Sequence, residues 1–182
     1  MKRRDFMMLS ASAAASMLFE PPAARAQYTT DARNQRAFDK LKRGFGQITK
    51  PSERARMAYV SNLIPLRDKA AKTKSDLWQT IDAEVKAHPA PTNSDSKALS
   101  ALLAGQWTSP RHDYLYRADG TWTMLPADPG ATNGTWRIEG NQYYDSGSLD
   151  PSQTSQYTIV LITKRDFVFF NDKGVFYETR IK

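Results

Sequence analysis

The sequence predicts an α+β fold, in which a helical N-terminal segment is followed by an antiparallel meander of about eight short strands that closes into a small barrel. In the first half of the chain, apolar residues recur at spacings of three and four, as they do along one face of a helix. From Gln106 onward the period changes to two, and residues that favour tight turns separate the apolar runs. Closing such a sheet on itself removes its exposed edges.

The first 26 residues have the features of an export signal. A pair of arginines is followed, after one residue, by Phe and a second apolar residue, and the apolar run behind them is too short and too mild to span a membrane. Small residues then precede Gln27. The residues concerned are Arg3, Arg4, Phe6, Ala24 and Ala26. The segment resembles a twin-arginine (Tat) signal peptide, which implies cleavage before Gln27 and a periplasmic mature protein. The alternative is an uncleaved helix that tethers the domain to the membrane.

Residues 27–88 are expected to form a basic helical segment. A first helix is expected to be capped by Thr30 or Asp31 and to end at the two glycines of residues 44–46, because glycine stops a helix at little cost. A second helix is expected to begin within residues 49–53, which include a proline suited to a first turn.

The rest of this helical segment is interrupted by prolines. We expect Pro65 to kink or end the second helix. Ser75 and Asp76 are expected to cap a third helix, whose apolar residues recur at spacings of three and four and which stops at His88–Pro89. The apolar side of this helix is expected to pack on its neighbours or on the second half of the chain, with a partner-binding role as the alternative.

Residues 89–97 are rich in Pro, Ser, Thr and Asn and are expected to form a linker or a surface crossing. Residues 98–182 are expected to form the barrel domain, which opens with a short helix over residues 98–104. The strands are expected at Trp107 to Ser109, Asp113 to Arg117, Thr121 to Leu125, Gly134 to Ile138, Gln142 to Asp145, Gln156 to Thr163, Phe167 to Asn171 and Val175 to Ile181.

Charge is distributed unevenly along the chain. Residues 27–74 hold 12 Lys and Arg against 4 Asp and Glu, a net charge of +8, whereas residues 75–182 hold 10 against 13, a net charge of −3. We therefore expect the helical segment to face an anionic envelope surface or an acidic periplasmic protein, with a merely solvated basic surface as the alternative. Nucleic acid is not an expected partner, because no DNA-binding motif accompanies the basic residues.

The residue inventory argues against a cofactor and against catalysis. The chain has no cysteine and two histidines, which leaves little to hold a haem, an iron–sulfur cluster or copper, so no cofactor is expected. His112 and Asp113 are neighbours on an expected strand, so they point to opposite faces and do not make a catalytic pair. The segment Asp145–Asp150 offers oxygen ligands but lacks the spacing of a calcium loop, so we expect a turn and no metal.

Several residues of the second half resemble a known family. Gly105 and Trp107 open the first expected strand, an Asp–Gly hairpin follows at residues 119–120, a further Gly–Thr–Trp run begins at Gly134, and Arg180 lies in the last strand. These features resemble the lipocalin-like (calycin-type) barrels of secreted bacterial proteins. The resemblance covers residues 99–182. It implies that the tryptophan closes one end of an eight-stranded barrel and that the arginine of the last strand packs across its ring.

The matching region departs from full lipocalins in one respect: full lipocalins are nearly twice as long as residues 99–182 and enclose a ligand cavity. Strands of five or six residues in an eight-stranded barrel leave an interior that is about filled by its own side chains. The side chains expected there are Trp122, Met124, Trp136, Tyr157, Ile159, Leu161, Phe167, Phe169 and Tyr177.

Two functions follow as hypotheses. The first is an exported, non-catalytic binding or interaction protein that presents the barrel loops or the basic helices to a partner. The second is a carrier or sensor of a small apolar or amphipathic ligand held in the barrel. Its expected ligand-binding residues are Tyr114, Tyr116, Trp122, Tyr143 and Tyr144. A hydrolytic enzyme is a distant third hypothesis, because groups suited to acid–base catalysis are scarce.

Overall fold

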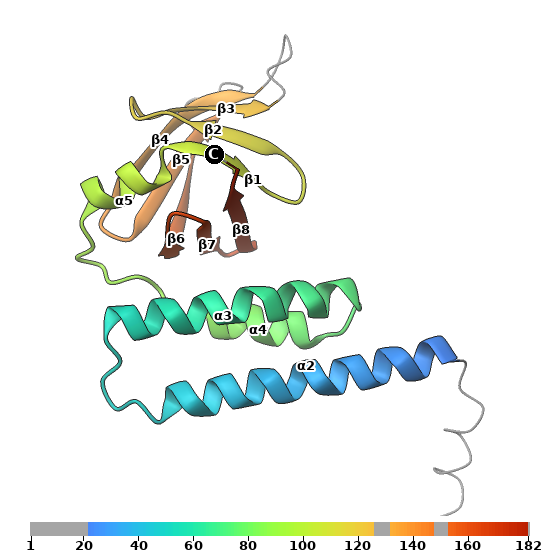
Figure 1. Ribbon diagram of the computed structural model, residues 1–182. Coiled ribbons are helices and arrows are strands. Elements are labelled where there is room, and N and C mark those ends of the chain that lie inside the picture. The colour runs from blue at the N-terminus through green and yellow to red at the C-terminus, as the bar shows by residue number, and fades with distance from the viewer. Residues whose placement is uncertain (1–21, 126–131, 148–152, 182) are drawn as a thin grey trace, which may run out of the picture.

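The structure, a computed structural model, describes residues 22–125, 132–147 and 153–181, with side chains from residue 30 onward. In this part of the chain helices come first and strands follow (Figure 1). The helices are α2 (Pro22–Gly46), α3 (Glu53–Lys72), α4 (Leu77–Lys86) and α5 (Ser96–Leu103). None of these helices is both long enough and apolar enough to cross a membrane.

The strands form a closed antiparallel barrel in which each strand pairs with the next and the last pairs with the first. They are β1 (Gly105–Thr108), β2 (Asp113–Tyr116), β3 (Thr121–Leu125), β4 (Asn133–Glu139), β5 (Gln142–Gly147), β6 (Thr154–Ile162), β7 (Asp166–Asn171) and β8 (Gly174–Arg180). The barrel closes where β1 pairs with β8, with Trp107 opposite Arg180 and Thr108 opposite Thr179. The predicted α+β fold, helices followed by an eight-stranded antiparallel barrel, is therefore confirmed, and the strand ends agree to within one or two residues.

The expected cap of the first helix is wrong, and Pro65 does not end the second helix. Helix α2 begins at Pro22 and runs through Thr30 and Asp31, so neither residue caps it. The Asp31 carboxylate instead accepts a hydrogen bond from the Thr73 hydroxyl at the end of α3, at 2.8 Å. Helix α3 continues through Pro65 to Lys72, although the proline removes one backbone hydrogen bond. Packing of buried side chains on both sides of Pro65 outweighs that loss.

The two other helix starts depend on short polar side chains. At α4, Asp76 occupies the capping position without a side-chain bond, and the Ser75 hydroxyl accepts from the Leu77 N–H at 3.4 Å. At α5, the Asp95 carboxylate accepts from the N–H groups of Lys97 and Ala98, at 2.9 and 3.1 Å. Such capping bonds supply partners to N–H groups that the first turn of a helix leaves free.

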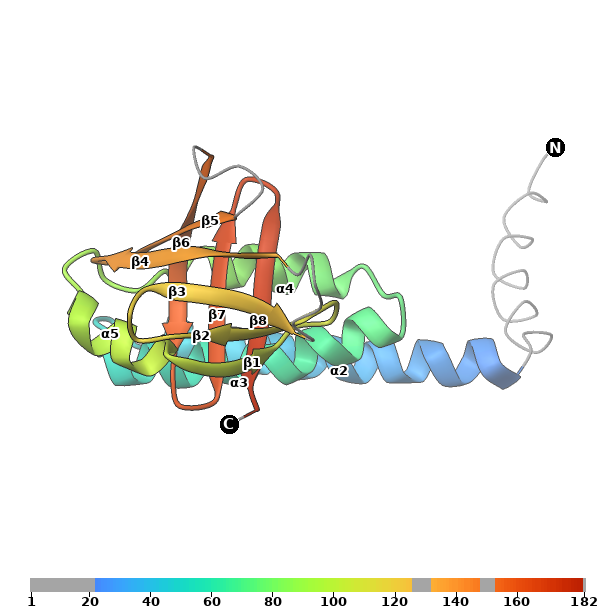
Figure 2. The same cartoon turned by 90° about the horizontal axis from the view of Figure 1, so that it is seen from above.

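The helices pack on the outer face of β6, β7 and β8 (Figures 1 and 2). Apolar side chains of α2, α3 and α4 join those strands in one core that lies outside the barrel. Its buried members are Phe38, Tyr59, Val60, Leu63, Ala70, Leu77, Ile81, Val85, Val160, Leu161 and Val168. The apolar side of α4 therefore packs on the neighbouring helices and on the barrel. This part of the barrel wall is covered on both faces, because a second core lies inside the barrel.

A bulge in β6 makes that double coverage possible. The pairing with β7 shifts between Ile159 and Leu161, so that Val160 and Leu161 both face the helices while Ile159 and Ile162 face the barrel interior. A bulge places two residues of one strand opposite one of its partner and so interrupts the alternation of faces. Leu161 is thus not an interior residue as expected, and neither is Tyr177, which faces the helices from β8.

Arg56 of α3 ties the helices to the barrel. Its guanidinium donates to the backbone carbonyls of His88, at 2.7 Å, and Val160, at 2.6 Å. Farther along, Ala90 is buried, donates its N–H to the Ile159 carbonyl at 2.9 Å and accepts from the Asn141 side chain at 2.7 Å. The stretch of residues 89–97 is therefore a surface crossing that is hydrogen-bonded to the barrel.

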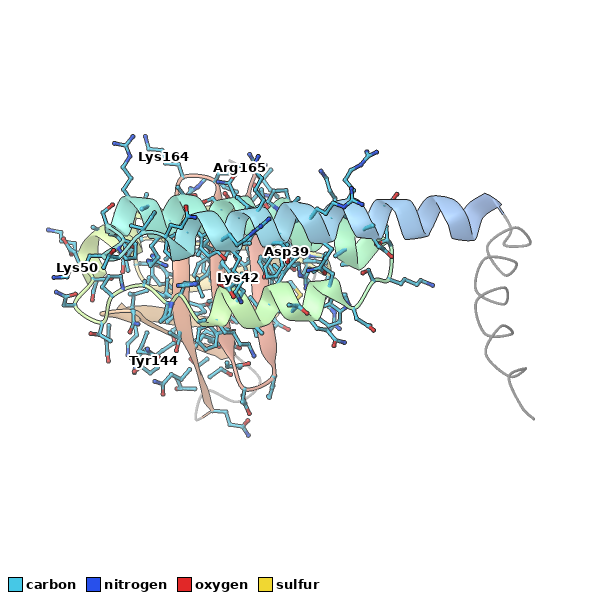
Figure 3. The ribbon with its side chains drawn as sticks, turned by 90° about the horizontal axis from the view of Figure 1, so that it is seen from below. Asp39, Lys42, Lys50, Tyr144, Lys164 and Arg165 are labelled. Atoms are coloured by element: carbon cyan, nitrogen blue, oxygen red, sulfur yellow. The ribbon has the colours of Figure 1, made fainter. Side chains whose placement is uncertain are left out.

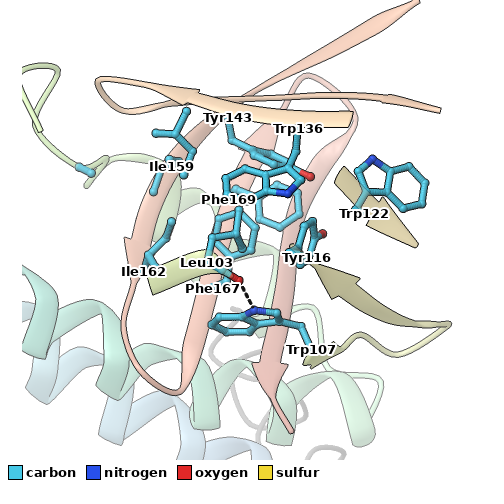
Figure 4. Close-up of a cluster of buried hydrophobic side chains, with 12 residues drawn as sticks. Leu103, Trp107, Tyr116, Trp122, Trp136, Tyr143, Ile159, Ile162, Phe167 and Phe169 are labelled. Carbon is cyan, nitrogen blue, oxygen red and sulfur yellow. Dashed lines mark hydrogen bonds between the residues drawn. The ribbon is translucent and has the colours of Figure 1, made fainter. Parts of the chain in front are cut away.

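One end of the barrel, here called the closed end, is plugged by Trp107 and α5 (Figure 4). The Trp107 indole N–H donates to the Leu103 carbonyl at 2.7 Å, and the Arg180 guanidinium lies 4.5 Å from the centre of a Trp107 ring. That guanidinium also donates to the carbonyls of Leu102 and Ala104. Gly105, which opens β1, has a φ of 145°. The structure thus places these residues where the resemblance implied.

The residues of the expected export signal are mostly outside the described part. Arg3, Arg4 and Phe6 lie outside the described residues. Ala24 and Ala26 fall in the first turns of α2, of which only the backbone is described. The export signal therefore stays a prediction.

Candidate functional site

A cavity of about 530 Å³ lies at the end of β1 that is remote from α5, here called the open end of the barrel. Strand β1 pairs with β8 only through Trp107 and Thr108, and the chain then turns away through residues 109–112. The first half of β8 is thus without a β1 partner, and the cavity opens beside it. Its volume is in the range of small-molecule sites. The expectation of a filled interior therefore holds for the closed end and not for the open end.

Glu178 of β8 is the most deeply buried charged group of this cavity, with 6% of its surface exposed. Its Oε1 accepts a hydrogen bond from the Tyr116 hydroxyl at 3.2 Å. Its Oε2 is buried and has no hydrogen-bond partner among the described residues. A buried carboxyl oxygen without a donor is costly, so this atom is where a bound group would contribute most.

Asp145 of β5 supplies a second carboxyl group to the same cavity. Its Oδ2 accepts from the Tyr143 hydroxyl at 3.3 Å. The Tyr143 and Tyr116 rings are edge to face, with centres 6.4 Å apart, and each hydroxyl influences the pKa of the other. Tyr116 donates to Glu178, Tyr143 donates to Asp145, and the two tyrosine rings contact each other between the carboxyl groups.

Both carboxyl groups hold their protons more tightly than usual. Burial raises the pKa of Glu178 to about 8, with a further rise from the nearby charge of Asp145. Burial also raises the pKa of Asp145 to about 6. Burial raises the pKa values of the Tyr116 and Tyr143 hydroxyls well above the ordinary value, so both stay neutral donors.

Aromatic rings form much of the remaining wall. The Tyr114 ring lies 5.9 Å from that of Trp122, edge to face, and 6.1 Å from that of Tyr116. Across the cavity, Tyr157 meets Phe176 edge to face, with centres 5.5 Å apart. The Trp122 indole N–H is buried without a partner in the described part of the chain. The cavity therefore combines ring faces with a few polar atoms that remain available.

The structure brings together three of the five expected ligand-binding residues. Tyr114, Tyr116 and Trp122 line the cavity. Tyr143 is 1% exposed within the barrel core (Figure 4), and its hydroxyl reaches the cavity through its hydrogen bond to Asp145. Tyr144 is not part of the group. Successive residues of a strand point to opposite faces, so Tyr144 lies outside the barrel, where the guanidinium of its β4 neighbour stacks on its ring at 4.2 Å.

His112 is at the rim of the cavity and is exposed. Its ring contacts that of Tyr114 edge to face, with centres 6.4 Å apart. The nearby Ser109 hydroxyl accepts from the backbone N–H groups of Arg111 and His112, at 3.3 and 3.1 Å, and donates to the His112 carbonyl at 2.9 Å. That serine therefore holds the turn together, and the group has no arrangement of nucleophile and base.

Sequence reasoning did not assign the two carboxyl groups to a site. The resemblance places Arg180 over Trp107, and strand alternation then predicts that Glu178, two positions earlier in the same strand, also faces inward. For the same reason Asp145, two positions after Tyr143 in β5, faces the same side of the sheet as Tyr143. Asp145 was expected to begin a turn, whereas it lies within β5, which extends to Gly147. Residues 148–150 of that expected turn lie outside the described part.

The described residues contain no cluster of three or more side chains suited to hold a metal ion. Comparison with known proteins gives no match: neither a protein family, nor a curated protein, nor a solved structure matches this chain. The geometry of the cavity is therefore the basis for a functional assignment.

Proposed function

We propose that the protein is an exported binding protein that holds a small amphipathic ligand in the open end of a lipocalin-like barrel. The single observation that carries the proposal is the cavity of about 530 Å³, which is lined by rings and by Glu178, whose buried Oε2 has no donor among the described residues. Binding sites typically combine apolar walls with a few placed polar atoms in this way. This is the carrier or sensor hypothesis, which the cavity favours over a barrel that acts through its outer surface alone.

The likeness to lipocalins is supported by the arrangement of the closed end. An antiparallel barrel of eight sequential strands, with a tryptophan in the first strand beneath an arginine of the last, is the architecture that the resemblance implies. The location is part of the proposal and depends on the Tat-like segment. The proposal includes no catalytic step; hydrolase activity that is lost in His112→Ala would contradict it.

Native mass spectrometry of the mature protein from a periplasmic extract tests this function. We expect a mass excess that disappears on denaturation, that is lost in Tyr114→Ala and that is retained in Tyr144→Ala, whose side chain lies outside the barrel. The proposal is wrong if the wild-type protein is empty and no fraction of small molecules from the same extract raises its melting temperature.

A second candidate function concerns the outer face of α2. This helix lies on the side of the molecule away from the barrel (Figure 3). Its exposed side chains include Arg33, Arg36, Lys40 and Arg43. Such a face is suited to an anionic envelope surface, where each cation contributes about 1 kcal/mol near the charged head groups.

Co-sedimentation with phosphatidylglycerol vesicles tests the second candidate. We expect binding that falls with salt and that is weakened by Arg36→Glu combined with Lys40→Glu. Lys97→Glu combined with Lys173→Glu, in α5 and in the turn between β7 and β8, is the matched control with an equal change in charge on exposed residues. Equal binding by all variants would show that the α2 face is only a solvated surface.

A further inference from the structure

We infer that the cavity selects an organic cation, an ammonium group on an apolar body, and that Glu178 recognises the ammonium group. This inference rests on the proposed binding function and adds the chemical class of the ligand. It begins from Glu178, which lines the cavity and whose Oε2 is buried and has no donor within the described residues. An ammonium N–H supplies the missing donor and a charge of the opposite sign, and hydrogen bonds between ions are stronger than neutral ones.

Three arginines lie near the acidic pair of the cavity, and Arg111, in the turn before β2, is exposed at the cavity rim. Arg67, at the cavity wall, is engaged by Asp82 at 3.2 Å and by the Tyr177 ring, 4.6 Å from its guanidinium carbon. Arg180, two residues from Glu178 in β8, is held at the closed end over Trp107. No cationic group of the described chain contributes to the pKa of either carboxyl group. The cavity is therefore acidic, although the chain carries a net charge of +7.

The walls of the cavity favour the same class of ligand. Tyr114, Trp122 and Tyr157 line it from three different strands and carry electron-rich ring faces. A cation over such a face is attracted by the ring, and the attraction grows when water is excluded. A neutral or anionic head group would gain nothing comparable from these rings.

A metal ion suits the cavity less well than an organic cation. Calcium requires six to eight oxygen ligands and magnesium a near-ideal octahedron. Asp145 and Glu178 are the carboxylates that line the cavity in the described part, and their neighbours are tyrosines that keep their protons. A ligand that needs one or two acceptors and a large apolar contact fits the arrangement better.

Binding of the cation is coupled to release of a proton. Titratable groups from several elements surround Glu178, and burial keeps its carboxyl group largely protonated at neutral pH. The titratable and charged residues at the cavity or directly beneath it are Arg67, Arg111, His112, Tyr114, Tyr116, Tyr143, Asp145, Tyr157 and Tyr177. An arriving ammonium group stabilises the ionised carboxylate, so the proton leaves to solvent as the ligand binds.

Titration calorimetry with three probes of equal chain length tests the inference on the whole protein: hexylammonium, hexanol and hexanoate. Measurement at pH 7 in two buffers of different ionisation enthalpy also counts the protons released. We expect hexylammonium to bind at least about tenfold more tightly than hexanol and to release a proton, because a charged hydrogen bond contributes that much. Hexanoate is expected not to bind.

Two variants assign the effect to the carboxyl group. Glu178→Gln retains an acceptor for the Tyr116 hydroxyl and is expected to weaken hexylammonium binding at least about tenfold while changing hexanol binding by less than about twofold. It should also abolish proton release. Glu139→Gln makes the same chemical change on an exposed side chain and is expected to bind like wild type.

The remaining outcomes overturn the inference. Equal binding of hexanol and hexylammonium would show a cavity without charge selection, which leaves the proposed binding function intact. Competition by calcium chloride at the concentration of hexylammonium would point to a metal site. If none of the three probes binds, the cation class is wrong, and the native mass measurement then decides the binding function separately.

Discussion

At the closed end of the barrel, Trp107 donates its indole N–H to a carbonyl of α5 and lies beneath Arg180, whose guanidinium is held by two more carbonyls of the same helix end. At the open end, Glu178 and Trp122 each keep a buried polar atom without a partner in the described chain. Burial at the closed end is compensated by bonds within the protein. The contrast indicates that stability is concentrated at one end and binding capacity at the other.

Removing the plug of the closed end should have the largest effect on stability. Trp107→Ala deletes a fully buried indole, its bond to Leu103 and its contact with Arg180. We expect a loss of about 3–5 kcal/mol in the free energy of unfolding, measured by urea denaturation. A loss below about 1 kcal/mol would show that the two ends do not differ in this respect.

At the open end, replacing Glu178 by a neutral residue should raise the free energy of unfolding, whereas Trp107→Ala lowers it. Its pKa is raised in the folded state, from 4.5 to about 8, so the folded protein binds one proton more than the unfolded chain across this interval. Stability therefore falls as pH rises from about 4.5 to 8. We expect Glu178→Gln to remove the decline between about pH 6 and 8, above the range in which Asp145 titrates, and to gain about 1–3 kcal/mol at pH 8, allowing for relaxation of the site.

Urea denaturation at a series of pH values measures this gain. Glu139→Gln, on the barrel surface, is the matched control and should reproduce the decline seen in wild type. If Glu178→Gln is less stable than wild type at pH 8, the Glu178 carboxyl group stabilises the folded protein, as Trp107 and Arg180 do at the closed end.

Asp145 should behave like Glu178 on a smaller scale and in a lower pH range. Burial raises its pKa from 3.8 to about 6, so its ionisation lowers stability as pH rises through that interval. We expect Asp145→Asn to gain about 1 kcal/mol at pH 7 and nothing at pH 3.5, by the same linkage. Thermal melts at the two pH values check this, and a gain of equal size at both would exclude titration as the cause.

The smallest effect on stability, and a clear one on binding, is expected from the wall of the cavity. Tyr114→Ala removes a partly exposed ring and should cost less than about 1 kcal/mol of stability, yet weaken hexylammonium binding about fivefold. Tyr144→Ala, with its ring outside the barrel, should change the affinity by less than about twofold. Equal binding losses in both variants would contradict the placement of the site.

The sequence predicted the barrel better than it predicted the helices or the site. Turn residues such as Asp119 and Gly120 mark chain reversals locally, so strand ends were within one or two residues. The passage of α3 through Pro65 depends on contacts with other elements, which no local rule contains. The bulge at Val160 likewise depends on the helices that cover β6, and regular alternation cannot anticipate it.

The sequence predicts the orientation of the two carboxyl groups of the site but not the cavity that they share. Alternation around Arg180 and Tyr143 predicts that Glu178 and Asp145 face inward. That they line one cavity depends on the order and stagger of distant strands, β5 and β8, around the closed barrel. The cavity itself depends on the short pairing of β1 with β8, which ends at Thr108 and Thr179.

The core between the helices and the barrel sets the time at which the protein can fold during synthesis. Helices α3 and α4 leave the ribosome early, but their partners on the barrel, including Val160, Leu161 and Val168, belong to β6 and β7 near the end of the chain. The barrel closes only when β8 reaches β1. The sides of α3 and α4 that face the barrel therefore stay uncovered until the last strands have been made, and during this interval the nascent chain is open to chaperones and to aggregation.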